Sequence, residues 1–128
     1  MSRLYIGTSG YSYTDWVPSF YPETLPKNRY LEFYASEFNA VELNFTYYSM
    51  PSSQSLKRMA LNTPSDFRFT VKANKSFTHE RKGDIGETAL HFIKALEPLI
   101  DDSKLGSLLF QFPYSFHYNI ESRKYLDS

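Results

Sequence analysis

The feature that most constrains the fold of this chain is an alternation between short apolar segments and segments with helical spacing. We predict buried strands over residues 3–8, 40–44, 67–72 and 107–112, because each is a short apolar run of the kind that a parallel sheet buries. The links between these runs are not hairpin turns, and each contains a stretch with helical periodicity. Strands that are joined through helices form parallel sheets with right-handed crossovers, so we predict an α/β fold.

Three helices are predicted in the links. The first follows Pro26 and ends near Phe38, the second covers residues 52–61, and the third covers residues 87–100, where Pro98 is expected to distort the helix locally. Their apolar positions recur at steps of three and four residues, which predicts that one face of each helix packs inward. On the third helix this face comprises Leu90, Ile93, Leu96, Leu99 and Ile100.

The length of the chain limits how much of such an architecture it can form. The predicted strand ends lie about 30 to 40 residues apart, the size of one βα unit, and a further helix begins near Asn119. A closed barrel of eight such units needs roughly 250–280 residues. We therefore expect residues 1–128 to form a single domain, about half of a TIM-like barrel. Its two open sheet edges should make it self-associate or pair with a missing second half.

Charge and cysteine content exclude several classes of function. Fourteen Lys and Arg balance fourteen Asp and Glu, which removes a whole-molecule electrostatic argument for a nucleic-acid or anionic membrane partner. There is no cysteine, so disulfides, thiolate zinc sites, iron–sulfur clusters and a cysteine nucleophile are excluded. No segment approaches the roughly 20 apolar residues of a membrane span, and the first residues lack a signal-peptide pattern. We expect a cytoplasmic protein with no membrane partner.

In parallel α/β folds, ligands bind at the carboxyl ends of the strands, so the polar residues at those ends are candidates for a site. The first predicted strand ends at Thr8 and Ser9, and the loop after it is rich in aromatic residues, including Tyr13 and Trp16. This loop is longer than a simple connection requires. It could form one wall of a binding site.

The second predicted strand carries two polar residues on one side of the sheet. Glu42 and Asn44 alternate with Val41 and Leu43, so their side chains point to the opposite side from these apolar residues. A carboxylate and an amide facing the barrel axis would be costly without a partner or a ligand. A Lys or Arg on a neighbouring strand could equally satisfy Glu42, in which case its role would be structural.

The third predicted strand ends at Lys72, and the loop after it is basic. This loop contains one acid, Glu80, together with three basic residues and one titratable histidine: Lys75, Arg81, Lys82 and His79. An anion such as phosphate or carboxylate could be held by this group, although Arg81 and Lys82 are also typical of a solvated loop. Lys72 closes an apolar strand and should be partly buried. At the same level the fourth strand carries Gln111, which could bind a ligand or tie down a loop.

Several common catalytic motifs are missing from the sequence. Residues 7–10 (GTSG) lack the spacing of a serine nucleophile elbow, the histidines lack zinc-binding spacing, and there is no P-loop or dinucleotide-binding fingerprint. Glu42 and His79 could contribute to a divalent metal site, but two candidates do not make a coordination sphere. We therefore assign no metal ligands, and the cofactor stays unknown.

Four ordered sequence blocks resemble a known family. The blocks are residues 6–13 (IGTSGYSY) with Trp16, residues 38–44 (FNAVELN) with Tyr47, Tyr48 and Pro51, residues 71–72 with Thr78 and His79, and residues 109–113 (LFQFP) with Phe116. Together they resemble the YecE-like family of uncharacterised proteins, a domain of unknown function (DUF72). Two positions depart from the family pattern: Tyr11 stands where Trp is usual, and Met50 lies where a basic residue is common nearby.

The resemblance implies a TIM-like barrel of roughly twice this length, of which the chain would be the amino-terminal half. It implies no established reaction. It does imply that nine residues converge at one mouth: Thr8, Ser9, Tyr13, Trp16, Glu42, Asn44, Lys72, His79 and Gln111.

Our first functional hypothesis is a barrel enzyme, or part of one, that acts on a polar small molecule containing a sugar or phosphate group. Glu42 would be the general base, Lys72 would stabilise negative charge and His79 would act as an acid or second base. Asn44 and Gln111 would orient the substrate, and the aromatic loop would form the wall. The alternatives are a non-catalytic module that binds nucleic acid or another polyanion through the basic loop and exposed Tyr13, Trp16 and Phe77, or an inactive fragment.

Overall fold

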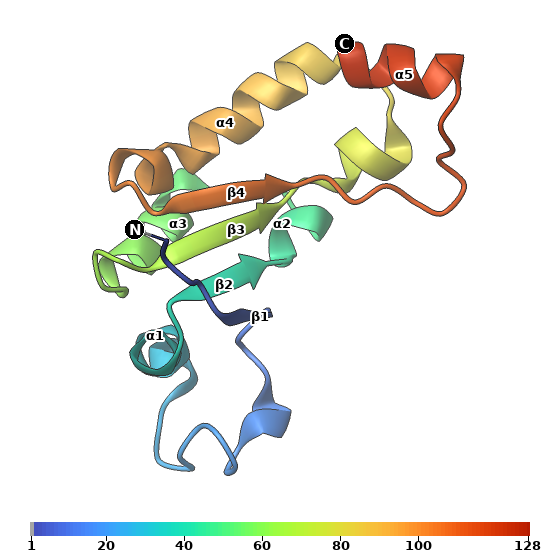
Figure 1. Ribbon diagram of the computed structural model, residues 1–128. Helices are drawn as coiled ribbons and strands as arrows, with labels where there is room; N and C mark the ends of the chain where they lie inside the picture. The colour runs from blue at the N-terminus through green and yellow to red at the C-terminus, as the bar shows by residue number, and fades with distance from the viewer. Residues whose placement is uncertain (1) are drawn as a thin grey trace.

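The computed structural model describes residues 2–128 and contains one sheet of four parallel strands in the order β1-β2-β3-β4 (Figure 1). The strands are β1 (Gly7–Ser9), β2 (Ala40–Leu43), β3 (Arg68–Lys72) and β4 (Leu105–Leu109). Each strand pairs in parallel with the next one along the chain. The predicted α/β fold is confirmed, and the sheet corresponds to half of a TIM-like barrel, four strands of the usual eight.

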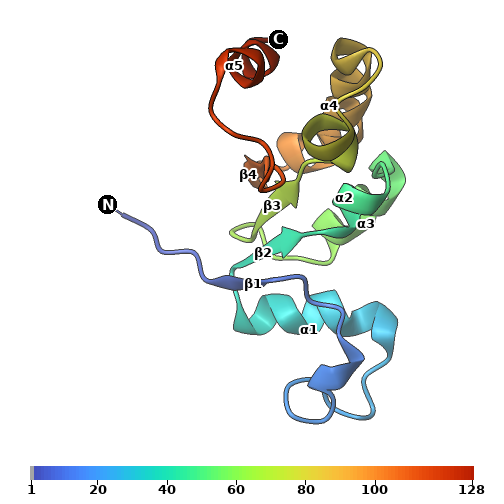
Figure 2. The ribbon, with the colours of Figure 1, turned by 90° about the vertical axis from the view of Figure 1, so that its right-hand side faces the viewer.

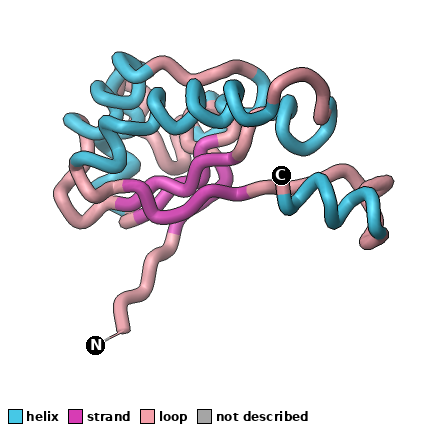
Figure 3. Tube along the Cα trace, turned by 90° about the horizontal axis from the view of Figure 1, so that it is seen from above, coloured by secondary structure: helices cyan, strands magenta, loops and turns pink. Residues whose placement is uncertain are grey.

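The connecting helices gather on one side of the sheet (Figures 2 and 3). They are α1 (Tyr30–Glu37), α3 (Ser53–Leu61) and α4 (Ile85–Asp101). A short helix that was not predicted, α2 (Phe45–Tyr48), directly follows β2, and α5 (Ile120–Asp127) lies beyond β4 at the opposite end of the molecule from α1 (Figure 2). Helix α4 continues through Pro98 without interruption.

Two of the predicted strands have the wrong bounds. The first strand begins at Gly7 instead of Arg3, because the chain before it is held by a side chain: the Ile6 backbone N–H donates to Asn39 Oδ1 (2.7 Å) and Asn39 Nδ2 donates to the Leu4 carbonyl (2.8 Å). The fourth strand covers Leu105–Leu109 instead of residues 107–112. Its ladder therefore ends two residues before Gln111.

The apolar core lies between the sheet and its helices. Val41 and Leu43 of β2 and Phe69 and Val71 of β3 point toward the helices and are almost fully buried. The helices supply large buried partners, including Tyr34, Leu56, Leu96 and Leu99. Because side chains alternate along a strand, the residues between these apolar ones lie on the opposite face, which no helix of residues 2–128 covers (Figure 3).

The predicted inward face of α4 is only partly correct. Leu96 and Leu99 are buried as expected, together with Phe92, but Leu90, Ile93 and Ile100 are 71%, 50% and 45% exposed. The buried residues pack on the side of α4 that faces α3 and the sheet. Leu90, Ile93 and Ile100 lie on a part of the helix surface that these contacts leave exposed.

A buried lysine joins the last strand to helix α3. Lys104 is only 7% exposed, and its ammonium group donates to the Ala60 carbonyl (2.5 Å), the Thr63 carbonyl (2.8 Å) and Thr63 Oγ1 (3.2 Å). These acceptors lie at the carboxyl end of α3, where the backbone carbonyls lack partners within the helix and the helix dipole favours a cation. Lys104 therefore acts as a C-terminal cap from a distant part of the chain.

We predict that Lys104→Met lowers the free energy of unfolding by about 1–3 kcal/mol. The buried Thr63 carbonyl loses its donor, and the Ala60 carbonyl and Thr63 Oγ1 each lose one of their hydrogen bonds. Lys57→Met, on the exposed side of α3, is the matched control and should change stability by less than about 0.5 kcal/mol. Urea denaturation followed by circular dichroism measures both. Equal stability of the two variants would contradict the capping role of Lys104.

Both outer strands present unpaired edges. Within residues 2–128, β1 pairs only with β2, and β4 pairs only with β3. Leu108 of the edge strand β4 is 37% exposed. Open strand edges beside exposed apolar side chains favour association.

We expect the isolated chain to self-associate in solution. Size-exclusion chromatography with light scattering should show a mass above that of one chain, and Leu108→Lys should shift the protein toward the monomer because charge on an edge strand opposes pairing. Tyr114→Lys, at an exposed position outside the sheet, serves as the control. A stable monomer in dilute buffer would contradict the expectation.

Candidate functional site

A row of polar side chains crosses the uncovered face of the sheet. The register pairs Ser9 with Glu42, Glu42 with Thr70, and Thr70 with Ser107, so each of the four strands contributes one member. Thr70 Oγ1 and Ser107 Oγ lie 2.9 Å apart and form a hydrogen bond. The row results from in-register parallel pairing, in which residues at the same level point to the same face.

The carboxyl ends of β1 and β2 are joined by a side-chain network. Asn44 Nδ2 donates to Ser9 Oγ (2.5 Å), and Ser9 Oγ donates over 3.4 Å to Glu42 Oε1. Asn44 lies at the start of α2 but does not cap this helix with its side chain. Its Oδ1 atom is buried and, within residues 2–128, has no hydrogen-bond partner.

The aromatic loop after β1 is anchored to this network. The Tyr13 hydroxyl donates to the Ser9 carbonyl (2.8 Å), and the ring packs against Trp16 with centroids 4.9 Å apart. Tyr13 stays 42% exposed, whereas Trp16 is half-buried among Phe20 and Tyr21. The loop thus presents one partly exposed aromatic ring beside Ser9, supported from behind by packed aromatic rings.

Two other tyrosines of this region have structural roles. The buried Tyr21 hydroxyl donates to the Tyr11 carbonyl (2.5 Å), and burial raises the pKa of both phenols, helped in Tyr21 by neighbouring tyrosines. A raised pKa keeps a phenol protonated at neutral pH. Tyr11 and Tyr21 therefore serve as hydrogen-bond donors or packing groups and do not act as bases.

The carboxyl end of β3 carries a cationic cluster. The Lys72 ammonium group lies 4.7 Å from the centroid of the Tyr47 ring, and the His79 ring meets the same tyrosine edge-on at 5.1 Å. His79 Nδ1 forms a 2.8 Å hydrogen bond with Thr78 Oγ1, which leaves Nε2 available for other partners. Lys72 is half-buried, as the sequence predicted.

Hydrogen bonds from two side chains to the backbone connect helix α2 to this end of the sheet. Thr46 Oγ1 donates to the Lys72 carbonyl (2.6 Å), and Asn74 Nδ2 donates to the Thr46 carbonyl (3.0 Å). Both side chains are buried. They connect α2 to the end of β3, so that Tyr47 and Lys72 are positioned relative to each other.

Glu42 and Lys72 lie on the same face without forming an ion pair. Glu42 is level with Thr70, and Lys72 follows two residues later on β3. In the part of the chain that the structure describes, neither residue makes a salt bridge. Glu42 could have a structural role if a neighbouring Lys or Arg neutralised it. No such Lys or Arg forms an ion pair with Glu42 among residues 2–128. The same residues contain no group of three potential metal ligands.

Two of the predicted site residues do not join these clusters. Thr8 pairs with Val41 on the helix side of the sheet, where its hydroxyl donates to the Gly10 carbonyl (2.6 Å) and contacts the Tyr34 hydroxyl (2.9 Å). Gln111 is exposed beyond the end of β4. The structure brings together the other predicted residues in two groups: Ser9, Tyr13, Trp16, Glu42 and Asn44, and Lys72 with His79.

The basic loop is less available than the sequence suggested. Phe77, expected to be exposed, is only 6% exposed and packs against Phe92. The Arg81 guanidinium donates to the Thr78 carbonyl (2.5 Å) and lies over the Phe116 ring. Two members of the expected polyanion-binding surface are thus engaged in internal contacts.

Sequence reasoning missed three residues of the site. Thr70 and Ser107 complete the polar row, and strand alternation counted back from Lys72 would have found Thr70. The β4 register shifts at the Phe69/Thr70 step, which obscures the position of Ser107. Tyr47 lies on the unpredicted helix α2, and its contact with Lys72 depends on tertiary packing.

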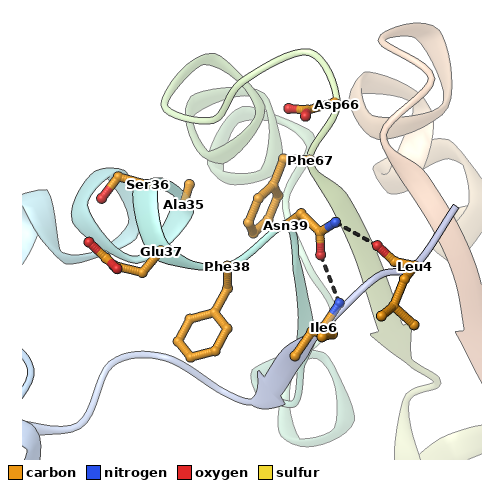
Figure 4. A pocket seen from close by; sticks show the side chains of 9 residues that line it. All are labelled: Leu4, Ile6, Ala35, Ser36, Glu37, Phe38, Asn39, Asp66 and Phe67. Atoms are coloured by element: carbon orange, nitrogen blue, oxygen red, sulfur yellow. Dashed lines mark hydrogen bonds between the residues drawn. The ribbon is translucent and has the colours of Figure 1, made fainter.

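The clearest cavities lie away from this face. One of about 450 Å³ lies at the amino end of the sheet beside the Asn39 clamp on Leu4 and Ile6 (Figure 4). Another of about 710 Å³ is lined mainly by apolar groups of α4, α5 and the segment after β4, including Phe77, Phe110 and Phe112. Neither contains Glu42 or Lys72, because an open half barrel forms a surface at the strand ends and not an enclosed pocket.

Comparison with known proteins shows which family the chain belongs to. The family described as "Protein of unknown function DUF72" matches residues 5–128. The chain belongs to the DUF72 family. Among relatives, it is 32% identical to UPF0759 protein YunF of Bacillus subtilis, over 96% of this chain and 44% of YunF. It is 29% identical to UPF0759 protein YecE of Escherichia coli K12, over 88% of this chain and 39% of YecE.

Solved structures of DUF72 proteins agree with the fold. A protein of Thermotoga maritima superposes with a TM-score of 0.83 at 42% identity, covering 96% of this chain and 49% of that chain. A protein of Enterococcus faecalis superposes with a TM-score of 0.78 at 25% identity, covering 44% of its own length. This DUF72 chain therefore spans about half the length of its relatives or less. No helix among residues 2–128 has both the length and the apolar character needed to cross a membrane.

We predict that Gly10→Ala disrupts the aromatic loop. Gly10 has a φ of +78°, and an added Cβ would lie 2.3 Å from the Tyr13 hydroxyl, so Tyr13 would have to leave Ser9. The expected cost is about 1–3 kcal/mol, and the emission of Trp16, the single tryptophan, should change. Gly83→Ala is the control, because its φ is similarly positive but no atom lies within 4 Å of the added Cβ. Unchanged Trp16 emission in Gly10→Ala would contradict the contact.

Proposed function

We propose that the carboxyl ends of β1, β2 and β3 bind a small polar molecule that carries an anionic group. The observation that carries the proposal is a set of unsatisfied polar groups on one face. The Glu42 carboxylate accepts one long hydrogen bond, the buried Asn44 Oδ1 accepts none within residues 2–128, and Lys72 contacts an aromatic ring in place of an acid.

A buried, unpaired acceptor such as Asn44 Oδ1 costs stability unless a further partner satisfies it. Glu42 and Lys72 are half-buried and have no ionic partner within residues 2–128, so both are free to contact a ligand. The helix side of the same sheet is filled with well-packed apolar residues, so the fold itself does not require polar groups on the other side. Their position matches the end of a parallel sheet where ligands bind in α/β folds. A molecule bound at this end of the sheet is the partner that we propose for these groups.

Chemical roles follow from the residue types. Glu42 is proposed as the general base, because its carboxylate has open acceptor positions. Lys72 would stabilise negative charge on the ligand, and His79, with a free Nε2, would act as a proton donor or second base. Ser9 and Asn44 would orient the ligand through the hydrogen-bond network that links them.

The first test concerns the anion. Inorganic phosphate is titrated into the protein, and NMR chemical shifts should show that it binds at Lys72. The substitution Lys72→Met should weaken this binding by about tenfold, because a charge-assisted hydrogen bond contributes about 1.5–3 kcal/mol. Lys82→Met, at an exposed position of the same loop, should leave the affinity unchanged. Equal effects of the two substitutions would refute an anion site at Lys72.

A second test separates a functional Glu42 from a structural one. Because Glu42 has no ion pair within residues 2–128, Glu42→Gln should change the free energy of unfolding by less than about 0.5 kcal/mol. Thermal and urea denaturation measure this change. A loss of several kcal/mol would show that the carboxylate holds the fold together and would remove it from the proposed chemistry.

A further inference from the structure

We infer that the ligand of this site is a polyhydroxylated small molecule with one terminal anionic group, such as a sugar phosphate or a sugar acid. The inference rests on the anion site proposed above and adds the chemistry of the rest of the ligand. It comes from the unequal composition of the two ends of the site.

The β1–β2 end presents mainly hydrogen-bond acceptors. The Ser9 hydroxyl receives its hydrogen bond from Asn44 and gives its own to Glu42, which leaves the Glu42 carboxylate and Asn44 Oδ1 with unused acceptor capacity. A carboxylate repels phosphate, so this end does not suit the anionic group. Ligand hydroxyls are the complementary donors, because each can donate to an acceptor that the protein leaves open.

An aromatic ring borders the same end. Tyr13 is fixed beside Ser9 through its hydroxyl and is supported by Trp16, so it remains partly exposed in a defined place. A sugar ring has apolar C–H groups on its faces and hydroxyls around its rim. An aromatic ring next to unsatisfied acceptors therefore complements both parts of a sugar.

The β3 end presents donors and positive charge. Lys72 lies against Tyr47 with no carboxylate partner in the described chain, and His79 borders the same tyrosine. The register places Lys72 one strand and two residues away from Glu42, a Cα separation of about 8 Å from standard strand spacings. This separation is comparable with the length of a monosaccharide phosphate. One ligand can thus place hydroxyls at Glu42 and its anionic group at Lys72.

Isothermal titration calorimetry with four probes tests this inference: glucose 6-phosphate, gluconate, glucose and inorganic phosphate. At least one of the two anionic sugars should bind about tenfold or more tightly than both glucose and inorganic phosphate, and which of them binds better identifies the anionic group. Glu42→Gln should weaken the anionic sugar about tenfold and leave inorganic phosphate unchanged, because only hydroxyls contact the carboxylate. Glu80→Gln, an exposed acid of the basic loop, is the matched control.

The outcomes separate this inference from the anion site itself. If inorganic phosphate binds as tightly as both anionic sugars and still depends on Lys72, the anion site stands and the polyhydroxylated ligand is wrong. If Glu42→Gln weakens every probe equally, the separate hydroxyl end is wrong. If none of the four probes binds to folded protein, both the inference and the anion site fail. Circular dichroism of each variant confirms that the fold is retained.

Discussion

In-register pairing of the four parallel strands is the constraint on which the rest of the structure depends. Because side chains alternate along each strand, pairing Ser9, Glu42, Thr70 and Ser107 at one level puts all four on the same face. The same register sends Val41 and Phe69 to the other face. A shift of one residue in any strand would bury a polar residue under the helices and expose an apolar one.

The two faces of the sheet consequently have different environments. On the helix side, the Tyr34 hydroxyl bonds Thr8 and the Ala40 carbonyl, and Lys104 caps α3, so these polar groups are satisfied internally. On the uncovered side, Glu42, Asn44 and Lys72 retain unused bonding capacity. Residues 2–128 supply no second layer on this side of the sheet (Figure 3). The uncovered side is therefore where an additional molecule, whether ligand or protein, gains the most from binding.

Some aromatic residues lie in the core, and others lie at the strand ends beside the candidate site. Tyr21 stacks on Tyr30 and Tyr34 stacks on Phe38, and these buried tyrosines pack the first loop and α1 into the core. Tyr13 and Tyr47 instead lie at the strand ends beside polar groups, one next to Ser9 and the other under Lys72. Similar side chains thus stabilise the fold in one place and shape the candidate site in the other, because their neighbours differ.

The sequence by itself determined the alternation of strands and helices, the parallel sheet and the sidedness of Glu42 and Asn44, because these depend on local periodicity. The tertiary structure decided which side chains meet. It turned Thr8 toward Tyr34, placed Tyr47 beneath Lys72 and joined Asn44 to Ser9, contacts between residues distant in the chain. It also decided that Leu90, Ile93 and Ile100 stay exposed, although their spacing matches that of a buried face. Periodicity shows that a helix has an apolar face, but whether that face is covered depends on the element packed beside it.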